Sequence, residues 1–387
     1  MSQATPVAKQ VLVLGASSEA ARAVKELLAL GYKVLWVSGD ELPSNGLDSP
    51  ALAKYANCRL YALEGHVGRF VSHFLHQGQR LALSTSAIIV ATGNERYFPA
   101  ERYGLELSSL VWTTSQVKEQ LKKPLPQSVL AFRDKRILLL LDWSGETSKE
   151  LVSESFSLAG ELCERCRSEV YFFYRDLTVD SPGWEQRTRE LRDKGVVFCR
   201  YGEPEVTVGE AAVSISYLEG TVEGDLLVLP EAVRPRGDTA ELAEILQVRL
   251  GEDGYFQELN IRKYRAGLSA RKGIFFAGRC HMDCDASEAE SDALQVVAAV
   301  DALLGQGALE PEEVIAYVDP SKCIRCLTCV RTCPHAAVQV VEYEDMDVVA
   351  ARVDELACWG CGACASNCPV QAIEMVGQEM PAWVQGV

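Results

Sequence analysis

The sequence has no long apolar run, and it has fewer basic than acidic side chains. No stretch approaches the roughly 20 apolar residues that a membrane-spanning helix needs, and residues 1–10 lack the apolar core of a secretion signal. Lys and Arg number 38 against 54 Asp and Glu, which gives a formal net charge of −16. This charge disfavours nucleic acid and anionic membranes as partners and favours a protein with a basic docking patch. We therefore expect a cytoplasmic protein without a transmembrane segment.

The sequence also lacks a nucleophile and a base at the spacing of a known catalytic motif, so it does not indicate hydrolase chemistry. Its 387 residues are 48% hydrophobic and 24% charged. That length and composition are enough for two or three domains with packed cores.

Cysteine, in contrast, is abundant, and eight of the 14 cysteines stand in two runs near the C-terminal end. The runs that start at Cys323 and Cys358 both read C-x2-C-x2-C-x3-C-P, the spacing of two-cluster bacterial ferredoxins. In that pattern three thiolates of a run bind one cubane and the fourth binds the other cubane. We therefore predict two [4Fe–4S] clusters, one held by Cys323, Cys326, Cys329 and Cys368 and the other by Cys358, Cys361, Cys364 and Cys333.

Structural zinc is the main alternative for these cysteines. Zinc takes four ligands per ion, however, and does not explain two runs of four that each end in Cys-Pro. Each half is expected to close with an apolar strand, at residues 337–341 and 372–376. Because disulfide formation would destroy the cluster ligands, we expect a reducing compartment.

The N-terminal part begins with a strand–helix–strand pattern. Residues 10–14 form an apolar strand, residues 21–30 have helical apolar spacing, and residues 32–37 form a second strand. Such a βαβ unit opens a dinucleotide-binding fold, in which the loop after the first strand binds a pyrophosphate. The candidate cofactor-binding residues of this loop are Gly15, Ala16, Ser17, Ser18 and Ala20.

The glycine fingerprint of this loop is incomplete. Gly15 supplies the tight turn and Ala20 allows close helix packing, but Ser17 replaces the glycine expected at the pyrophosphate. The second strand ends at Ser38, where an acidic ribose ligand is expected, and Asp40 follows just beyond. A Rossmann-like core that binds no phosphate is therefore the alternative.

Two later segments resemble the flavoprotein disulfide reductases that have two dinucleotide-binding domains. Residues 86–93 form an apolar strand that ends in A-T-G, and residues 273–279 read G-I-F-F-A-G-R before a helix at 288–304. In that family both strands belong to the FAD domain, and the helix lies against the flavin. The resemblance implies FAD binding at Ala91, Thr92, Gly93, Gly278 and Arg279. Arg279 stands where many members carry an Asp, and its guanidinium can bind phosphate or a flavin carbonyl oxygen.

Between these segments lies a second α/β unit. Its strands are expected at residues 136–142, 169–174, 196–198 and 226–229, and its helices at 148–167 and 184–194. The turn at residues 143–147 has no G-x-G-x-x-G, so we expect no NAD site in this chain.

We predict an α/β fold with two thioredoxin-reductase-like Rossmann domains, followed by a two-cluster bacterial ferredoxin domain of the α+β class. The expected bounds are 1–130 with 268–312 for a split FAD-binding domain, 131–267 for an inserted degenerate domain and 313–387 for the ferredoxin-like domain.

Joined in one chain, these features resemble the A subunit of heterodisulfide reductase in a short form, as found in large anaerobic redox complexes. The segments at residues 171–177, 195–201 and 225–229 follow in the order of that family with similar residues. The resemblance implies an FAD between donor and acceptor subunits, with flavin-based bifurcation in some members. We therefore predict an electron-transfer subunit that relays electrons between FAD, two [4Fe–4S] clusters and redox partner subunits.

The complex could be heterodisulfide reductase-like, quinone-linked or of the benzoyl-CoA reductase type, and an oxidoreductase component is favoured over a stand-alone enzyme. The alternative is a flavin-free docking scaffold that carries a two-cluster electron wire.

The remaining cysteines suggest weaker alternatives. Cys163 and Cys166 form a C-x2-C pair at a helix end, where the helix dipole disfavours a thiolate, so ordinary helix thiols are favoured over a redox pair. Cys280 and Cys284 flank a His and an Asp, and an additional metal there, with Cys58 as a further ligand, stays open.

Overall fold

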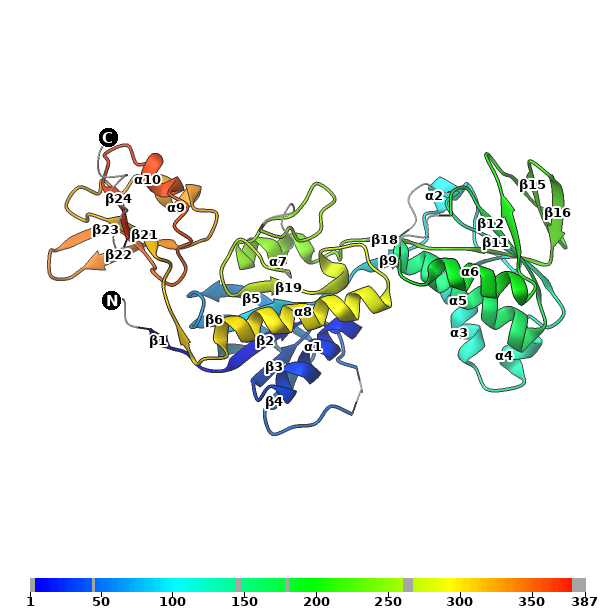
Figure 1. Cartoon of the computed structure of the whole chain (residues 1–387), viewed down its shortest axis with the longest axis horizontal. Helices are drawn as coiled ribbons and strands as arrows, with labels where there is room; N and C mark the ends of the chain where they lie inside the picture. The colour runs from blue at the N-terminus through cyan, green and yellow to red at the C-terminus, as the bar shows by residue number, and fades with distance from the viewer. Residues whose placement is uncertain (1–3, 44–45, 144–147, 178–180, 260–266, 378–387) are drawn as a thin grey trace. The chain divides into compact units, whose positions relative to one another are not determined.

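The computed structural model describes residues 4–43, 46–143, 148–177, 181–259 and 267–377. It divides into two compact units, the first made of residues 1–93, 235–282 and 288–387 and the second of residues 94–234 and 283–287. Figure 1 follows both units along the chain by colour. Most of the turn predicted at 143–147 lies outside the described residues, since only Trp143 of it is described.

A five-stranded parallel sheet forms the core of the first unit (Figure 1). In spatial order its strands are β19 (Ile274–Phe276), β8 (Ala87–Val90), β2 (Gln10–Leu14), β3 (Lys33–Val37) and β4 (Leu52–Tyr55). The side chains of β8 are all buried, as are those of β2 after Gln10, because parallel strands are covered on both faces. Helix α1 (Ser18–Ala29) follows β2, and helix α8 (Ala286–Leu304) follows β19.

The strand order reverses beside β2. The chain runs from β2 outward to β3 and β4, whereas β8 and β19 lie on the opposite side of β2. Because all these strands are parallel, the loops after β2, β8 and β19 meet at one edge of the sheet. Ligands of open α/β sheets bind at such a reversal, outside the carboxyl ends of the strands.

An antiparallel three-stranded sheet is inserted between β4 and β8, and the sequence did not predict it. Its strands are β5 (Cys58–Glu64), β6 (Phe70–His76) and β7 (Gln79–Thr85). Strand β6 alternates buried and partly exposed side chains, the period-2 pattern of a half-buried strand. Shorter elements of this unit are β1 (Thr5–Pro6), α7 (Thr239–Leu246), the 3-10 turn η1 (Gly278–Cys280) and β20 (Ala308–Leu309).

The second unit contains a second parallel sheet. Its order is β10 (Val111–Thr113), β17 (Leu226–Leu229), β11 (Arg136–Leu140), β12 (Glu169–Tyr174) and β13 (Val197–Arg200). Its helices are α2 (Ala100–Tyr103), α3 (Thr114–Lys122), α4 (Gln127–Leu130), α5 (Lys149–Cys166) and α6 (Trp184–Asp193). Antiparallel strands β14 (Glu205–Val208), β15 (Val213–Tyr217) and β16 (Gly220–Gly224) form a separate sheet, and β9 (Glu95–Tyr97) pairs with β18 (Ala232–Arg234).

The boundaries between the two units differ from the predicted ones at residues 130/131 and 267/268. The second unit takes residues 94–130 because β10 pairs in parallel with β17 of the inserted sheet. The first unit takes residues 235–267, whose helix α7 is tied to β5 by the ion pair of Glu241 with Arg59. Both features are short, three strand residues and eight helix residues, so their sequence periodicity is weak.

The C-terminal region of the first unit is built from two similar halves. Strand β21 (Val314–Val318) pairs with β24 (Ile373–Gly377), and β22 (Val338–Tyr343) pairs with β23 (Val348–Val353), both antiparallel. One short helix stands in each half, α9 (Thr328–Thr332) and α10 (Ala363–Ser366). This repeat places the two cysteine runs in corresponding positions.

Candidate functional site

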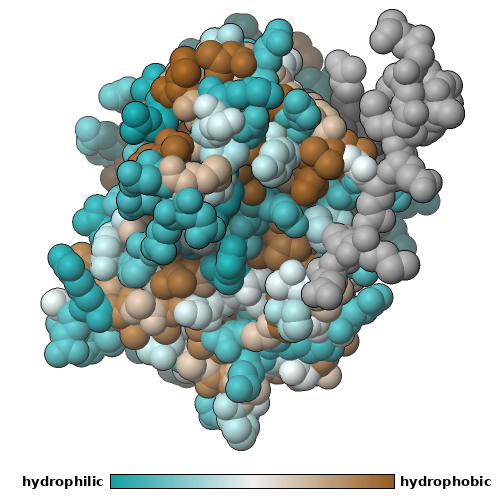
Figure 2. Space-filling view, turned by 90° about the vertical axis from the view of Figure 1, so that its left-hand side faces the viewer, coloured by the Kyte–Doolittle hydropathy of each residue, from teal (hydrophilic) through white to brown (hydrophobic). Residues whose placement is uncertain are grey.

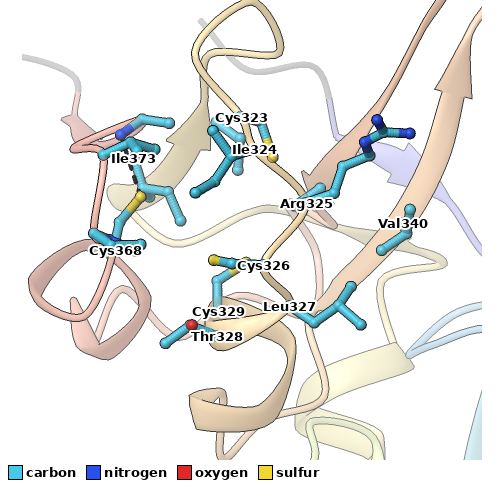
Figure 3. Close-up of a pocket in the computed structure, with 15 residues that line it drawn as sticks. Cys323, Ile324, Arg325, Cys326, Leu327, Thr328, Cys329, Val340, Cys368 and Ile373 are labelled. Carbon is cyan, nitrogen blue, oxygen red and sulfur yellow. Dashed lines mark hydrogen bonds between the residues drawn. The ribbon is translucent and has the colours of Figure 1, made fainter.

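The first cavity of the C-terminal region brings together four thiols from both cysteine runs. Its lining includes the predicted ligands of one cluster, Cys323, Cys326, Cys329 and Cys368. Figure 3 shows the first three on one loop and helix, with Cys368 reaching them from the second run. Arg325 and Leu327 have φ values of 57° and 62°, so the loop can curl around the space between the thiols. The rest of the lining is mostly apolar, with Ile324, Leu327, Val340 and Ile373 among its residues.

A second cavity repeats this arrangement with the other four thiols. It is lined by Cys333, Cys358, Cys361 and Cys364, together with His335 and Trp359. The same backbone hydrogen bond occurs in both halves. Ala337 N donates to Cys333 Sγ at 3.4 Å, and Ala372 N donates to Cys368 Sγ at 3.2 Å. Gly360 is required where it stands, since its φ is 65° and a Cβ there would lie 2.2 Å from Val314 O.

Both cavities fit a cubane better than a single metal ion. Nowhere among the described residues do three Cys, His, Asp or Glu side chains gather closely enough to hold one ion. Four thiols around a cavity, each set with one cysteine from the other run, match the larger [4Fe–4S] cluster. The Nε1 of Trp359, which lines the second cavity, is buried and has no hydrogen-bond partner within the described ranges. A cluster sulfur beside it would supply that acceptor.

The thiols within each cavity also affect one another's protonation. Burial, together with the neighbouring Cys333 and Cys358, raises the pKa of Cys364 to about 11. Hydrogen bonds from the hydroxyl and the backbone N–H of Thr328 lower the pKa of the exposed Cys326. Cluster binding must therefore remove protons from thiols of unequal acidity.

The loop after β2 is held tightly against the end of β8. Gly15 has a φ of 121°, and a Cβ there would lie 2.2 Å from Ala91 O, so only glycine fits. Ser17 caps α1 by accepting a hydrogen bond from Ala20 N at 3.2 Å, and its hydroxyl donates to Ala91 O at 2.8 Å. The serine that interrupts the glycine fingerprint thus joins the two loops at the predicted site. Gly93, with a φ of 72°, packs near the Cβ of Ser17.

A cavity of about 300 Å³ opens beside this loop, beyond the ends of β2 and β3. Its lining includes Gly15, Ala16, Ser38, Asp40, Cys58, Phe74, Thr92, Arg236 and Glu241. Asp40 stands near the place predicted for a ribose ligand and pairs with Arg236 at 2.9 Å. The cavity has the position and polar rim that the adenosine half of a dinucleotide needs.

A residue that the sequence did not predict as a site residue lies beside the loop where a dinucleotide's pyrophosphate is expected. Glu19 is fully buried in the first turn of α1. Its carboxylate accepts from the Arg279 backbone N at 3.2 Å, from Arg279 Nη1 at 3.0 Å and from the Ser18 hydroxyl at 2.9 Å. Burial alone would raise the pKa of Glu19, but the charge of Arg279 and these hydrogen bonds outweigh burial and lower the pKa. The sequence signal for Glu19 was its place in the fingerprint, between Ser18 and Ala20.

The turn that carries Gly278 and Arg279 has its own support. Gly278 N donates to Asp292 Oδ2 at 2.7 Å, and His281 Nε2 lies 3.0 Å from the same oxygen. His281 Nδ1 lies 3.5 Å from Glu258. The side chains of His281 and Asp292 are almost fully buried. No sequence motif indicated this network.

The other predicted cysteine sites are ordinary in their surroundings. Burial raises the pKa of both Cys163 and Cys166, the opposite of what a reactive pair needs. Cys280 is buried with its thiol 3.2 Å from Val90 O, and burial raises its pKa as well. Cys58 lies 2.9 Å from His76 Nδ1 on the neighbouring strand. No group of metal-ligand side chains forms around these thiols in the described part of the chain.

Comparisons with known proteins agree with this geometry. Residues 316–375 match the family model of a 4Fe-4S dicluster domain. The chain is 31% identical over 185 residues to the iron-sulfur A subunit of the CoB--CoM heterodisulfide reductase of Methanocaldococcus jannaschii, covering 45% of this chain and 28% of that protein. It is 26% identical over 303 residues to the A subunit of the H(2)/formate:CoB-CoM heterodisulfide,ferredoxin reductase of Methanococcus maripaludis, covering 70% of this chain and 44% of that protein. The chain therefore spans less than half the length of each of these two relatives.

Among solved structures, the thioredoxin reductase of Lactococcus lactis superposes with a TM-score of 0.50 at 14% identity, over 77% of this chain and 99% of that one. This likeness confirms the predicted fold, a thioredoxin-reductase-like pair of Rossmann domains followed by a dicluster ferredoxin domain. The dicluster domain supports two [4Fe–4S] clusters as cofactors. No helix in the described ranges combines the length and the apolar character needed to cross a bilayer.

Proposed function

We propose, from its sequence relation to the A subunit of heterodisulfide reductase, that this chain relays electrons between FAD, two [4Fe–4S] clusters and partner subunits of an oxidoreductase complex. Electron transfer through iron–sulfur clusters is the part that its relatives and its dicluster domain imply. The proposal adds that FAD takes part in the relay, that the eight cysteines are the cluster ligands and that partner subunits exchange electrons with this chain.

One observation carries the proposal: the second four-thiol cavity lies against the segment that leads into the candidate flavin site. His335 and Trp359 both line that cavity. His335 Nδ1 donates to Ala270 O at 2.7 Å, and Lys272 Nζ lies 5.4 Å from the ring centroid of Trp359. Lys272 stands just before β19, and β19 ends at the turn of Gly278. These contacts place the second four-thiol cavity at the start of β19, and the candidate flavin site follows the other end of the same strand.

A second contact joins the cluster region to the Rossmann core. Asp354 of the cluster region pairs with His66, and Arg69 Nη2 lies 3.1 Å from the same carboxylate. Burial would raise the pKa of Asp354, but the hydrogen bond and charge of His66, with the contact of Arg69, outweigh burial and lower the pKa. His66 thus has a structural partner, although the sequence alone gave it no role.

In this proposal FAD is held at the edge of the first sheet. The loop after β2, the A-T-G end of β8 and the turn after β19 would surround its phosphates, and the 300 Å³ cavity would take its adenosine half. The bound flavin supplies exchange between two-electron and one-electron chemistry. The chain contributes position, burial and tuning of the cluster potentials.

The first four-thiol cavity is proposed as the contact point for a protein partner in the complex. Exposed apolar side chains of Ile324, Leu327 and Val340 stand on its lining. Figure 2 shows apolar patches among hydrophilic side chains on one face of the molecule. The proposal includes partner subunits of the heterodisulfide reductase type, a cytoplasmic setting and flavin-based bifurcation. It also includes the lack of an NAD site in this chain.

The test is cofactor content and electron transfer in the full chain. The protein is purified without oxygen, reconstituted with iron, sulfide and FAD, and passed through a desalting column. About eight irons and about one FAD per chain, with cluster bleaching after flavin reduction, are expected. Eight irons with no retained FAD would replace the relay with the alternative, a flavin-free scaffold carrying a two-cluster wire. The buried Glu19 at the phosphate position is the observation that favours this alternative.

A further inference from the structure

The carboxylate of Glu19 lies in a site whose donors are those of a phosphate site. It sits at the start of the 12-residue helix α1, whose N-terminus attracts anions. A backbone N–H and a guanidinium of Arg279 and the hydroxyl of Ser18 all donate to it. Charged oxygens accept such hydrogen bonds strongly, whether they belong to a carboxylate or a phosphate.

The surroundings of the carboxylate are shaped to accept it. Gly278 has a φ of 69°, and a Cβ at this position would lie 2.3 Å from Glu19 Cγ and 2.6 Å from its Oε1. Only glycine therefore leaves room for Glu19, and the Gly278 backbone N donates a hydrogen bond to Asp292. Glu19 is thus enclosed by the residues around it, unlike an acidic side chain that is exposed at a helix N-terminus.

The place of this pocket in the Rossmann fold indicates which ligand group it would hold if Glu19 were absent. In a Rossmann fold the loop after the first strand and the first helix N-terminus bind the pyrophosphate of the dinucleotide. Glu19 and Arg279 meet at this place, where the loops after β2 and β19 converge. A carboxylate and a phosphate cannot share three donors, so a dinucleotide must compete with Glu19 for them.

We propose that Glu19 is an internal anion that occupies the pyrophosphate position and leaves it when a dinucleotide binds, which transfers Arg279 from Glu19 to phosphate. This deepens the proposed function, since it names the residue that sets how tightly the FAD site holds its ligand. Glu19 weakens every ligand that carries a phosphate at this position and leaves the adenosine half unaffected.

The experiment compares Glu19→Ala and Glu19→Gln with the wild-type full chain, all carrying both clusters. Glu26→Gln is the matched control, because Glu26 is on the same helix and pairs with Arg22 in an i,i+4 contact away from the site. Isothermal titration with ADP should show affinity roughly 10- to 100-fold higher in Glu19→Ala, the range of one hydrogen bond to a charged group. Adenosine should bind all variants equally, and Glu26→Gln should match the wild type.

Two further measurements separate this idea from the proposed function. Inorganic pyrophosphate should raise the melting temperature of Glu19→Ala more than that of the wild type, and adding Arg279→Ala should abolish this gain. Pyrophosphate and ADP gains without FAD retention would keep this inference and remove the flavin from the proposed function. If Glu19→Ala does not fold, Glu19→Gln carries the same comparison with the acceptor oxygen retained. Equal or weaker ADP affinity in the folded Glu19 variants would overturn the inference.

Discussion

At the scale of single residues, a substitution that interrupts a motif can be recognised by the contacts it makes instead. Ser17 stands where a glycine was expected, yet its hydroxyl caps α1 and bonds to Ala91 O. Glu19 likewise places a carboxylate at a helix N-terminus, where a Rossmann fold ordinarily binds the phosphate of a ligand. Sequence reasoning could mark both positions as departures, but the partners lie about 70 and 260 residues away in the chain.

The cluster cysteines give the sharpest prediction at this scale. Because Cys368 lines the cavity of the first run, Cys368→Ala and Cys323→Ala should each lower the iron content from about eight to about four per chain. The double variant of these two should lose no more iron than either single variant, since both remove the same cluster. Combining Cys368→Ala with Cys358→Ala should remove both clusters.

Iron and sulfide analysis of anaerobically reconstituted protein provides the measurement, and the buried Cys199→Ser serves as the control that keeps all its iron. The reverse pattern, with additive loss for Cys323 and Cys368, would mean that each run binds its own cluster.

At the scale of elements, one buried carboxylate ties three parts of the second unit together. Glu154 of α5 is nearly fully buried and contacts Arg96 of β9 at 2.7 Å and Lys118 of α3 at 2.9 Å. Burial would raise the pKa of Glu154, but its contacts with Arg96 and Lys118 outweigh burial and lower the pKa below its ordinary value of 4.5. The charged form is therefore the one that stabilises the fold.

We predict that Glu154→Gln destabilises the protein by on the order of 2 kcal/mol at pH 7, because Lys118 loses its charge partner and Arg96 keeps only Glu150 of its two carboxylates. A lowered native pKa gives stability that is present above about pH 4.5 and is lost as pH falls through the native value. The difference between variant and wild type in urea unfolding should therefore shrink below pH 4.5. The exposed Glu185→Gln, which breaks an i,i+4 pair with Arg189, should change the unfolding free energy by less than about 0.5 kcal/mol. A gap that persists unchanged at pH 3 would contradict the assignment.

Sequence patterns predicted some elements well and others not at all. Apolar strands such as β2, β11, β12 and β17 were found within one or two residues, because buried parallel strands are continuous apolar runs. The strands β5–β7 were not predicted, because Arg, His and Gln at their exposed positions interrupt the apolar pattern. Of the site, the cysteine spacing predicted both sets of four thiols that line the cavities, whereas the network of Glu19, Asp292 and His281 depends on the folded chain.

At the scale of the whole molecule, the two clusters should differ in their surroundings although their motifs are the same. The second cavity is backed by Trp359, His335 and the segment around Lys272, while the first has exposed apolar side chains on its lining. One-electron carriers in series need such differences, because hydrogen bonds and solvent exposure set each cluster's potential. From this contrast we predict an inward role for the second cluster and an outward role for the first.

Trp359 offers the measurement of that contrast. Its buried Nε1 has no acceptor among the described residues and lines the second cavity, so we expect it to donate to a cluster sulfur. Such a hydrogen bond stabilises the reduced cluster, and Trp359→Phe should lower one of the two reduction potentials by about 40 mV, the equivalent of about 1 kcal/mol for one electron. Redox titration followed by electron paramagnetic resonance should show this shift for one cluster, with the other unchanged and the iron content intact. Trp112→Phe, whose ring packs on Phe132 in the second unit, should move neither potential. Equal shifts of both clusters would argue against a separate inward cluster, because Trp359 lines only the cavity of Cys333, Cys358, Cys361 and Cys364.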